Sequence, residues 1–238
     1  MPEEPTADQL KALESAAESL SKKFSDDIPS IVIEFAGSPK SGKSTTIDIL
    51  THFFKRNGWK VWAPTEGASK RTPYHLRRDL VAFNTWTLNY AVSELLVAYH
   101  NVDHHHLVIM DRGPFDSIAW MGLLQKRDKL DSEECSIIRG FALHRRWASL
   151  ISRIYLFECD PSVSLCRENE SKLTTKSGTA MNENLLKELR AEYHRLADEL
   201  SSYPVKRVTT SKSTTPRATS FELAGDIVDL AKKKMPTS

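Results

Sequence analysis

A short stretch between residues 37 and 45 constrains the fold more than any other part of the chain. It reads Gly-Ser-Pro-Lys-Ser-Gly-Lys-Ser-Thr and fits the pattern G-x-x-x-x-G-K-[ST] without a mismatch. The apolar run IVIEFAG at 31–37 precedes it and is typical of a buried strand. A helical pattern over about 43–57 follows, with Gly58 as its stop. This order of strand, loop and helix predicts a phosphate-binding loop (P-loop).

Each residue type in this loop suits the binding of a phosphate chain. Gly37 and Gly42 let the backbone bend where a Cβ atom would clash, and the N–H groups present partial positive charge to an anion. Lys43 is expected to reach the β- and γ-phosphates, and the Ser44 hydroxyl to ligate Mg²⁺. The predicted nucleotide-binding residues are Gly37, Ser38, Pro39, Lys40, Ser41, Gly42, Lys43, Ser44 and Thr45.

The rest of the chain alternates between short apolar runs and helical patterns. We predict further strands at residues 60–63, 107–110, 154–157 and 205–209. We predict further helices at residues 75–100, 114–125, 132–150, 161–170, 182–200 and 220–233. This alternation indicates an α/β fold of the three-layer P-loop NTPase type, with a five-stranded parallel sheet and helices on both faces. An amphipathic pattern at 6–24 predicts an accessory N-terminal helix within residues 1–30, outside a main domain at 31–238.

Composition excludes several other classes of protein. The 238 residues carry 33 basic and 31 acidic side chains, so the net charge of +2 does not demand a nucleic acid or a membrane surface. The apolar runs fall far short of the roughly 20 residues of a membrane span, and the acidic start is unlike a secretory signal. Three irregularly spaced cysteines do not form a disulfide framework. We therefore expect a soluble, cytoplasmic protein without a membrane partner.

The third predicted strand ends in an acidic and a basic residue, Asp111 and Arg112. Ligands of open α/β sheets bind outside the carboxyl ends of the strands, where the P-loop also lies. An acid at this place is suited to hold Mg²⁺ through water, so Ser44 and Asp111 are the predicted metal residues. The guanidinium of Arg112 is suited to phosphate oxygens.

At this point the chain resembles the thymidylate kinase and deoxynucleoside kinase family of P-loop kinases. Thymidylate kinases carry an Asp-Arg pair here, followed by a serine, an alanine and an aromatic residue, to which Asp111, Arg112, Ser117, Ala119 and Trp120 are matched. The segment Ala-Pro-Thr-Glu-Gly at 63–67 is similar to the acid–proline element of the family, with glycine in place of proline. The resemblance covers about residues 31–233, with specific motifs at three places.

The resemblance implies roles for residues outside the P-loop. Glu66 corresponds to the proposed general base of the nucleoside kinases. A lid at about 166–180 contributes Arg167, Lys172 and Lys176, of which Arg167 is the predicted catalytic residue. ATP as donor, a contact between the adenine base and the backbone of residues 209–215, and pairing of two copies as a homodimer are further implications of the family.

The acceptor side departs from the thymidylate kinases. Some of those enzymes carry an Asp-Arg pair in the P-loop, where this chain has Pro39 and Lys40. They also carry an acceptor-phosphate arginine on the third helix, and the stretch at 83–90 has none. Nucleoside kinases use an amide and aromatic residues there, parts that suit Asn84 or Asn89 with Trp86. Arg77 and Arg78, farther upstream, keep a nucleotide acceptor open.

These observations predict an enzyme with Lys43, Glu66, Asp111, Arg112 and Arg167 as catalytic residues. The predicted reaction is Mg²⁺-dependent transfer of the γ-phosphate of ATP to a nucleoside or a nucleoside monophosphate. A kinase for another hydroxyl, such as an RNA end, a sugar nucleotide or a small metabolite, is the alternative. A nucleotide-binding switch is a further one, although the N-K-x-D motif of GTPase switches is absent from the sequence.

Overall fold

The computed structural model describes residues 3–25, 27–64, 72–100, 103–171, 174 and 181–235. Five parallel strands form one sheet in the order β2-β3-β1-β4-β5, which confirms the predicted sheet. The strands are β1 (Ile31–Gly37), β2 (Val61–Trp62), β3 (Leu107–Asp111), β4 (Ile151–Glu158) and β5 (Val205–Thr209).

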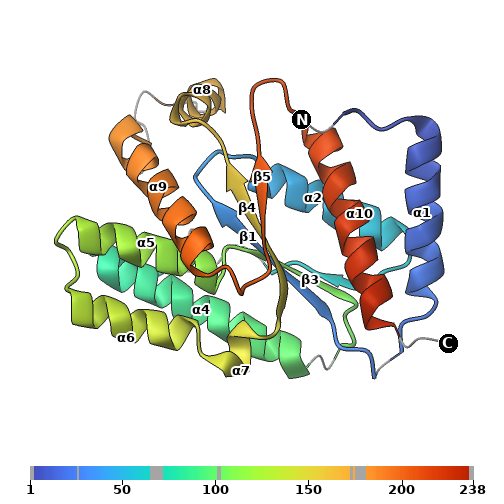
Figure 1. The fold of residues 1–238 in the computed structure, drawn as a ribbon, viewed down its shortest axis with the longest axis horizontal. Coiled ribbons are helices and arrows are strands. Elements are labelled where there is room, and N and C mark those ends of the chain that lie inside the picture. The colour runs from blue at the N-terminus through green and yellow to red at the C-terminus, as the bar shows by residue number, and fades with distance from the viewer. Residues whose placement is uncertain are drawn as a thin grey trace.

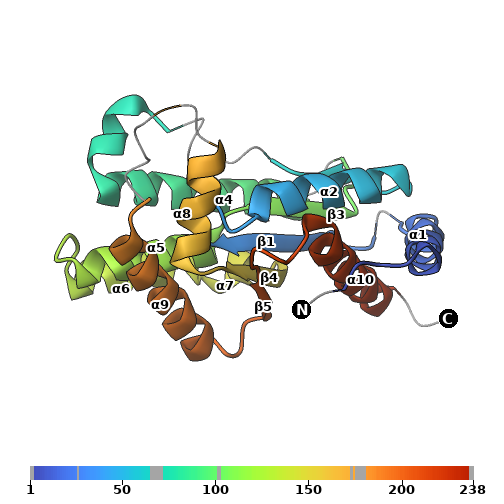
Figure 2. The same ribbon diagram turned by 90° about the horizontal axis from the view of Figure 1, so that it is seen from above.

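Helices cover both faces of this sheet, as predicted (Figure 1). On one face lie α2 (Lys43–Arg56) and α10 (Pro216–Lys234), with α1 (Ala7–Ser21) outside α10 (Figure 2). The other face carries α4 (Leu80–His100), α5 (Pro114–Lys126), α6 (Ser132–Ala142), α7 (Arg145–Ala148) and α9 (Glu183–Glu199). Two further helices are the short 3₁₀-helix η1 (Tyr74–Arg78) and α8 (Pro161–Ser171).

The residues of β1 alternate between the two faces, as a buried parallel strand requires. Ile33 and Phe35 pack with α1, α2 and α10, whereas Val32 and Ala36 pack with α4, α5 and α9. Glu34 shares the second face and is fully buried. A carboxyl group at that place needs hydrogen-bond donors from the covering helices, because an unpaired buried polar group is costly.

The N-terminal helix α1 contributes to the core on the α2 and α10 face. Ala17 and Leu20 are buried there, and the indole Nε1 of Trp59 donates to the Ala17 carbonyl at 2.8 Å. A capping box at Thr6 and Gln9 starts the helix, because each side chain accepts a hydrogen bond from the other residue's backbone N–H.

Several predicted boundaries were wrong, and local caps explain most of the differences. The predicted helix at 132–150 is divided into α6 and α7, since the His144 side chain caps α7. The predicted helix at 75–100 is divided into η1 and α4, where the Asp79 carboxylate accepts two backbone N–H groups. Thr215 caps α10 and starts it four residues earlier than predicted. Strand β4 begins three residues earlier because Ile151 pairs with Val32 of β1.

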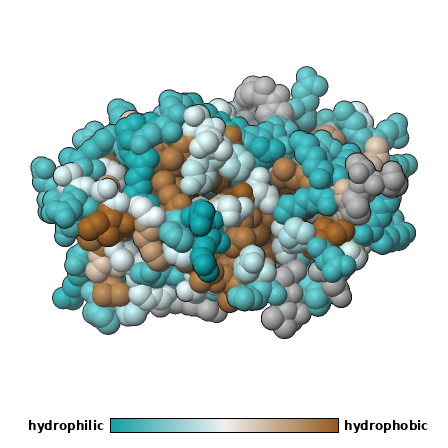
Figure 3. Space-filling view, turned by 60° about the horizontal axis from the view of Figure 1, so that its bottom comes forward, coloured by the Kyte–Doolittle hydropathy of each residue, from teal (hydrophilic) through white to brown (hydrophobic). Residues whose placement is uncertain are grey.

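The surface combines hydrophilic regions with apolar ones. On the face that Figure 3 presents, hydrophobic residues gather toward the middle and hydrophilic residues surround them. Exposed large apolar side chains include Val97 and Tyr99 on α4 and Ile137 on α6. Within the described part of the chain, the length and hydropathy needed to cross a bilayer are not found together in any helix.

Candidate active site

The P-loop lies at the carboxyl end of β1 and leads directly into α2. Gly37 has a φ of 133°, and Gly42, the N-cap of α2, has a φ of 102°, conformations that side chains with a Cβ atom rarely adopt. A pocket of about 630 Å³ opens above the loop. Its lining comprises Pro39, Lys40, Ser41, Gly42, Lys43, Ser44, Thr45, Thr46, Asp111, Arg112, Arg167, Ser171, Thr210, Thr214, Pro216 and Thr219. Gly37 and Ser38, also predicted to bind nucleotide, lie beneath this lining at the start of the loop.

Lys43 is held inside the P-loop. Its Nζ donates to the carbonyl oxygens of Gly37 and Ser38, at 2.8 Å each, and contacts the Ser41 hydroxyl at 3.4 Å. The residue is 5% exposed, so its cation is screened little by solvent. The loop thus joins a fixed positive charge to the N-terminus of α2, an arrangement suited to a phosphate chain.

Ser44 and Asp111 meet although 67 residues separate them. The Ser44 hydroxyl donates to Asp111 Oδ2 at 3.2 Å, because β1 and β3 are neighbours and end at the same edge of the sheet. A hydroxyl and a carboxylate supply the oxygen ligands that Mg²⁺ prefers, together with water and phosphate. These two residues therefore fit the metal. The described residues contain no cluster of three or more His, Cys, Asp or Glu side chains that offers an alternative metal site.

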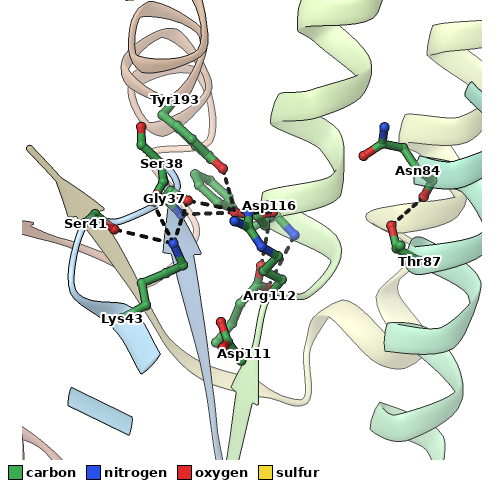
Figure 4. A network of polar contacts seen from close by, with 12 residues as sticks. Gly37, Ser38, Ser41, Lys43, Asn84, Thr87, Asp111, Arg112, Asp116 and Tyr193 are labelled. Atoms are coloured by element: carbon green, nitrogen blue, oxygen red, sulfur yellow. Dashed lines mark hydrogen bonds and ion pairs between the residues drawn. The ribbon is translucent and has the colours of Figure 1, made fainter. Parts of the chain in front are cut away.

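Arg112 is bound to a buried carboxylate that the sequence analysis did not identify. Its Nη1 lies 2.7 Å from Oδ2 of Asp116, one turn further along the chain (Figure 4). Asp116 is 2% exposed and also accepts hydrogen bonds from the Gly37 N–H at 3.0 Å and the Tyr193 hydroxyl at 2.5 Å. Burial raises the pKa of Tyr193 well above its usual range, so its hydroxyl keeps the proton that it donates. It is thus Asp116, and not the matched Ser117, that joins the P-loop to Arg112.

Glu34 holds the start of α5 and thereby Asp116. Its carboxyl oxygens accept the backbone N–H groups of Asp116 at 2.9 Å and Phe115 at 3.3 Å. The N-cap residue Gly113 has no side chain to do this, and a Cβ atom there would lie 2.5 Å from the Glu34 carboxyl carbon. Burial raises the pKa of Glu34 to about 8, opposed by these N–H groups and assisted by the charge of Asp116.

The raised pKa of Glu34 predicts a dependence of stability on pH. Since the folded-state pKa of about 8 exceeds the ordinary 4.5, the folded protein binds more protons between these pH values. The free energy of unfolding should therefore fall as pH rises from 5 to 8, with a contribution of up to about 1.4 kcal/mol per pH unit from this group. Urea unfolding at several pH values measures the slope. The slope of the free energy of unfolding against pH should be shallower by this contribution in Glu34→Gln. Equal slopes in the wild type and the variant would contradict the raised pKa of Glu34.

Arg167 lies in α8 and reaches over the tip of the P-loop. Its Nη1 donates to the Lys40 carbonyl at 3.1 Å and its Nη2 to the Ser211 carbonyl at 2.9 Å. In return, the Lys40 Nζ contacts Glu168 at 3.2 Å and Ser171 at 2.8 Å, both on α8. The structure therefore places Arg167 in the pocket, between the P-loop and the segment after β5.

Helix α4, which contributes no residue to the lining of this pocket, carries polar and aromatic residues. Asn84 is buried, and in Figure 4 its amide projects from α4 on the side facing Arg112 and Asp116. Its Nδ2 donates to the Leu80 carbonyl at 2.7 Å. Trp86 and Tyr90 stack with ring centroids 5.7 Å apart, whereas Asn89 is exposed. Of the two predicted asparagines, Asn84 is therefore the buried one.

Some predicted residues lie outside the described part of the chain. These are Glu66, Lys172, Lys176 and most of the predicted lid after Ser171. Arg77 and Arg78 are described and lie exposed on η1.

The polar residues that sequence reasoning missed are Glu34, Asp116 and Tyr193. A signal existed for Glu34, because a carboxyl group inside an otherwise apolar buried strand demands donors nearby. Asp116 could have been found as an acid in the first turn of a helix, four residues after Arg112. No local pattern distinguishes Tyr193 from an ordinary core tyrosine on α9.

Comparison with known proteins shows similarity at the level of the fold. No protein family model matches the chain, and no curated protein matches it either. Among solved structures, deoxyadenosine kinase from M. mycoides with bound dATP has a TM-score of 0.58 and 14% sequence identity, covering 84% of this chain and 100% of its own. The structure of the same enzyme with bound dCTP has a TM-score of 0.56, and the structure with the products dCMP and a flexible dCDP has a TM-score of 0.57. Each is 15% identical in sequence and covers 84% of this chain and 99% of its own. The chain therefore shares the fold of these deoxyadenosine kinase structures.

Proposed function

We propose that this protein is a Mg²⁺-dependent kinase that transfers the γ-phosphate of ATP to a nucleoside or a nucleoside monophosphate. The observation that carries the proposal is the convergence of Lys43, the Ser44–Asp111 pair, Arg112 and Arg167 on one pocket. Cations and oxygen ligands at the end of a P-loop are suited to the charge that a transferring phosphoryl group carries.

The donor phosphates would lie along the P-loop amides, with Lys43 beside the β- and γ-phosphates. Ser44 and, through water, Asp111 would hold Mg²⁺, which supplies neutralisation of charge on the phosphate oxygens. Arg112 and Arg167 would bind the migrating group from two sides. Glu66 is proposed to accept the proton of the acceptor hydroxyl. Because little covalent chemistry is required, positioning and charge supply most of the acceleration.

The acceptor is proposed to lie between Arg112 and α4. Two observations favour a nucleoside over thymidylate: α4 carries the Asn84 amide and the Trp86–Tyr90 stack, and the similar solved structures are of a deoxyadenosine kinase. An amide suits a nucleobase edge and an aromatic stack suits a base plane.

The proposal is tested by incubating the protein with ATP labelled at the γ-phosphate and a panel of acceptors. The panel contains deoxynucleosides, ribonucleosides, their monophosphates and an RNA oligonucleotide with a 5′-hydroxyl end. We expect label on a nucleoside or a monophosphate. Label on RNA alone would assign a different acceptor, and tight ATP binding without transfer to any acceptor would favour a nucleotide-binding switch.

Replacement of Asp111 by asparagine tests the metal assignment. We expect the transfer rate to fall by about 10²-fold or more, because the amide lacks the charge that holds Mg²⁺. A higher Mg²⁺ concentration should restore part of the rate. The matched control is Asp128→Asn, at an exposed turn with a φ of 54°, where asparagine fits and the rate should stay unchanged. An Asp111→Asn variant with the wild-type rate and Mg²⁺ dependence would remove Asp111 from the site.

A further inference from the structure

Asp116 is the centre of a buried network that joins three separate elements. Its carboxylate accepts from the Gly37 N–H at the end of β1, from Arg112 after β3 and from the Tyr193 hydroxyl on α9. Figure 4 shows these groups converging on it. Two of the three partners belong to the phosphate site, namely the first residue of the P-loop and the arginine beside it.

The network has little freedom to rearrange. Tyr193 is 1% exposed and Asp116 is 2% exposed, and Glu34 fixes the backbone of Asp116 from below at 2.9 Å. Arg112 has a φ of 65°, a costly backbone conformation for a residue with a side chain, so it must be held by its contacts. These contacts include its N–H bond to the Phe35 carbonyl at 3.0 Å and the ion pair with Asp116.

Of the three groups that donate to Asp116, the Tyr193 hydroxyl is the one that does not belong to the phosphate site. It belongs to α9, and its hydroxyl donates to Oδ1 of Asp116, the oxygen that also accepts the Gly37 N–H, whereas Arg112 pairs with Oδ2. Charge-assisted hydrogen bonds of this kind are strong and directional, so the tyrosine fixes the orientation of the carboxylate. That orientation in turn sets the direction of the Arg112 guanidinium.

We propose that Asp116 and Tyr193 are positioning residues that hold the Arg112 guanidinium at the P-loop for the transferring phosphoryl group. The inference rests on the proposed function, because it assigns a role to Arg112 in phosphoryl transfer. Neither residue touches the substrate. Tyr193 acts through Asp116, and Asp116 acts through Arg112.

The variant Tyr193→Phe tests this chain of contacts with the smallest change in shape. We expect kcat to fall about tenfold, the effect of one lost hydrogen bond to a buried charge, while KM for ATP changes less than about threefold. Asp116→Asn should have a larger effect on kcat, because it also removes the charge that pairs with Arg112.

The matched control is Tyr155→Phe. Tyr155 on β4 is also buried, and its hydroxyl donates to a different aspartate, Asp226, at 2.8 Å on the opposite face of the sheet. This variant loses the same kind of bond, so its melting temperature should fall by a similar amount, but its kcat should stay at the wild-type value. A general effect of lost stability would lower kcat in both variants.

A double-mutant cycle with Arg112→Ala separates positioning from structure. If Tyr193 acts through Arg112, Tyr193→Phe should change kcat little in the Arg112→Ala background. The same tenfold loss in both backgrounds, or a wild-type kcat in Tyr193→Phe, would overturn the inference while the kinase activity of the wild type stands.

A measurement without turnover keeps the two proposals distinguishable. The side-chain N–H signals of Arg112, assigned in ¹⁵N NMR spectra by comparison with Arg112→Lys, report directly on its guanidinium. We expect slow exchange with water in the wild type and in Tyr155→Phe, and faster exchange in Tyr193→Phe. Unchanged exchange in Tyr193→Phe would overturn the inference, whether or not any acceptor is phosphorylated.

Discussion

Replacing Lys43 with alanine is expected to lower kcat for phosphoryl transfer by about 10³-fold or more, as loss of a buried cation at a transferring phosphoryl group does. The Nζ of Lys43 lies within 2.8 Å of the Gly37 and Ser38 carbonyl oxygens, at the centre of the loop that would hold the donor. Because Lys43 is only 5% exposed, neither water nor a distant lysine can replace its charge at this place. Steady-state kinetics with the acceptor found in the labelled-ATP panel measures the loss.

A second lysine provides the control for this prediction. Lys234 near the end of α10 is also partly buried, and its Nζ donates to the Ser30 carbonyl at 2.7 Å. Its replacement by alanine removes a comparable lysine–carbonyl bond on another side of the molecule, so kcat should stay unchanged. A Lys43→Ala variant that folds and retains the wild-type kcat would exclude the P-loop from the mechanism.

Replacing Gly37 with alanine is expected to cause the largest loss of stability among the P-loop positions. A Cβ atom there would lie 2.1 Å from the backbone oxygen of Phe157, and the φ of 133° is itself strained for alanine. Because β1 and β4 are paired at these residues, neither backbone can move away without breaking the centre of the sheet. We expect a loss of about 3 kcal/mol or more in the free energy of unfolding.

Two other glycines calibrate that measurement by urea unfolding. Gly42→Ala meets strain at a φ of 102°, but among the described residues its Cβ atom would approach only Arg167, at 3.9 Å, so its loss should be about 1–2 kcal/mol. Gly140 lies within α6, and no described residue would come within 4 Å of a Cβ atom there, so Gly140→Ala should gain about 0.5–1 kcal/mol. Equal losses in the free energy of unfolding for Gly37→Ala and Gly42→Ala would contradict the prediction, because they would mean that the backbone avoids the collision between the new Cβ atom and Phe157.

The parts of the fold that local patterns determine were predicted from the sequence. The P-loop and its flanking strand and helix depend on residues close together in the chain. The C-cap of α2 at Asn57, before Gly58 with its φ of 80°, follows from the same kind of signal. The short strand β2 was also predicted, although it has only two paired residues. Hydrophobic periodicity predicts such elements because it reports which face is buried.

Features that depend on tertiary contacts were not predictable in this way. The early start of β4 at Ile151 reflects pairing with β1, and the order of the strands is a property of the whole sheet. Capping by His144 interrupts an apolar pattern that continues through it. Side-chain hydrogen bonds of this kind compete with helix propensity, and they cannot be read from periodicity.

The buried network around Asp116 shows the same limit for the site. Asp116 is separated in the sequence by 79 residues from Gly37 and by 77 from Tyr193, so no motif contains these three residues together. The residues proposed to bind phosphate are recognised by their spacing in the sequence, whereas the residues proposed to orient them are recognised by their burial and by the hydrogen-bond donors around them. Glu34 illustrates this, since its role is set by the N-terminus of α5 that covers it.

The central claim is that the pocket above the P-loop binds a nucleoside triphosphate by its phosphate chain. Isothermal titration calorimetry with MgATP tests it most directly, with circular dichroism to confirm that each sample is folded. We predict one binding site per chain in the wild type and in Lys234→Ala, and a greatly weakened site in Lys43→Ala. Folded wild-type protein that gives no heat of binding with either MgATP or MgGTP would contradict the account.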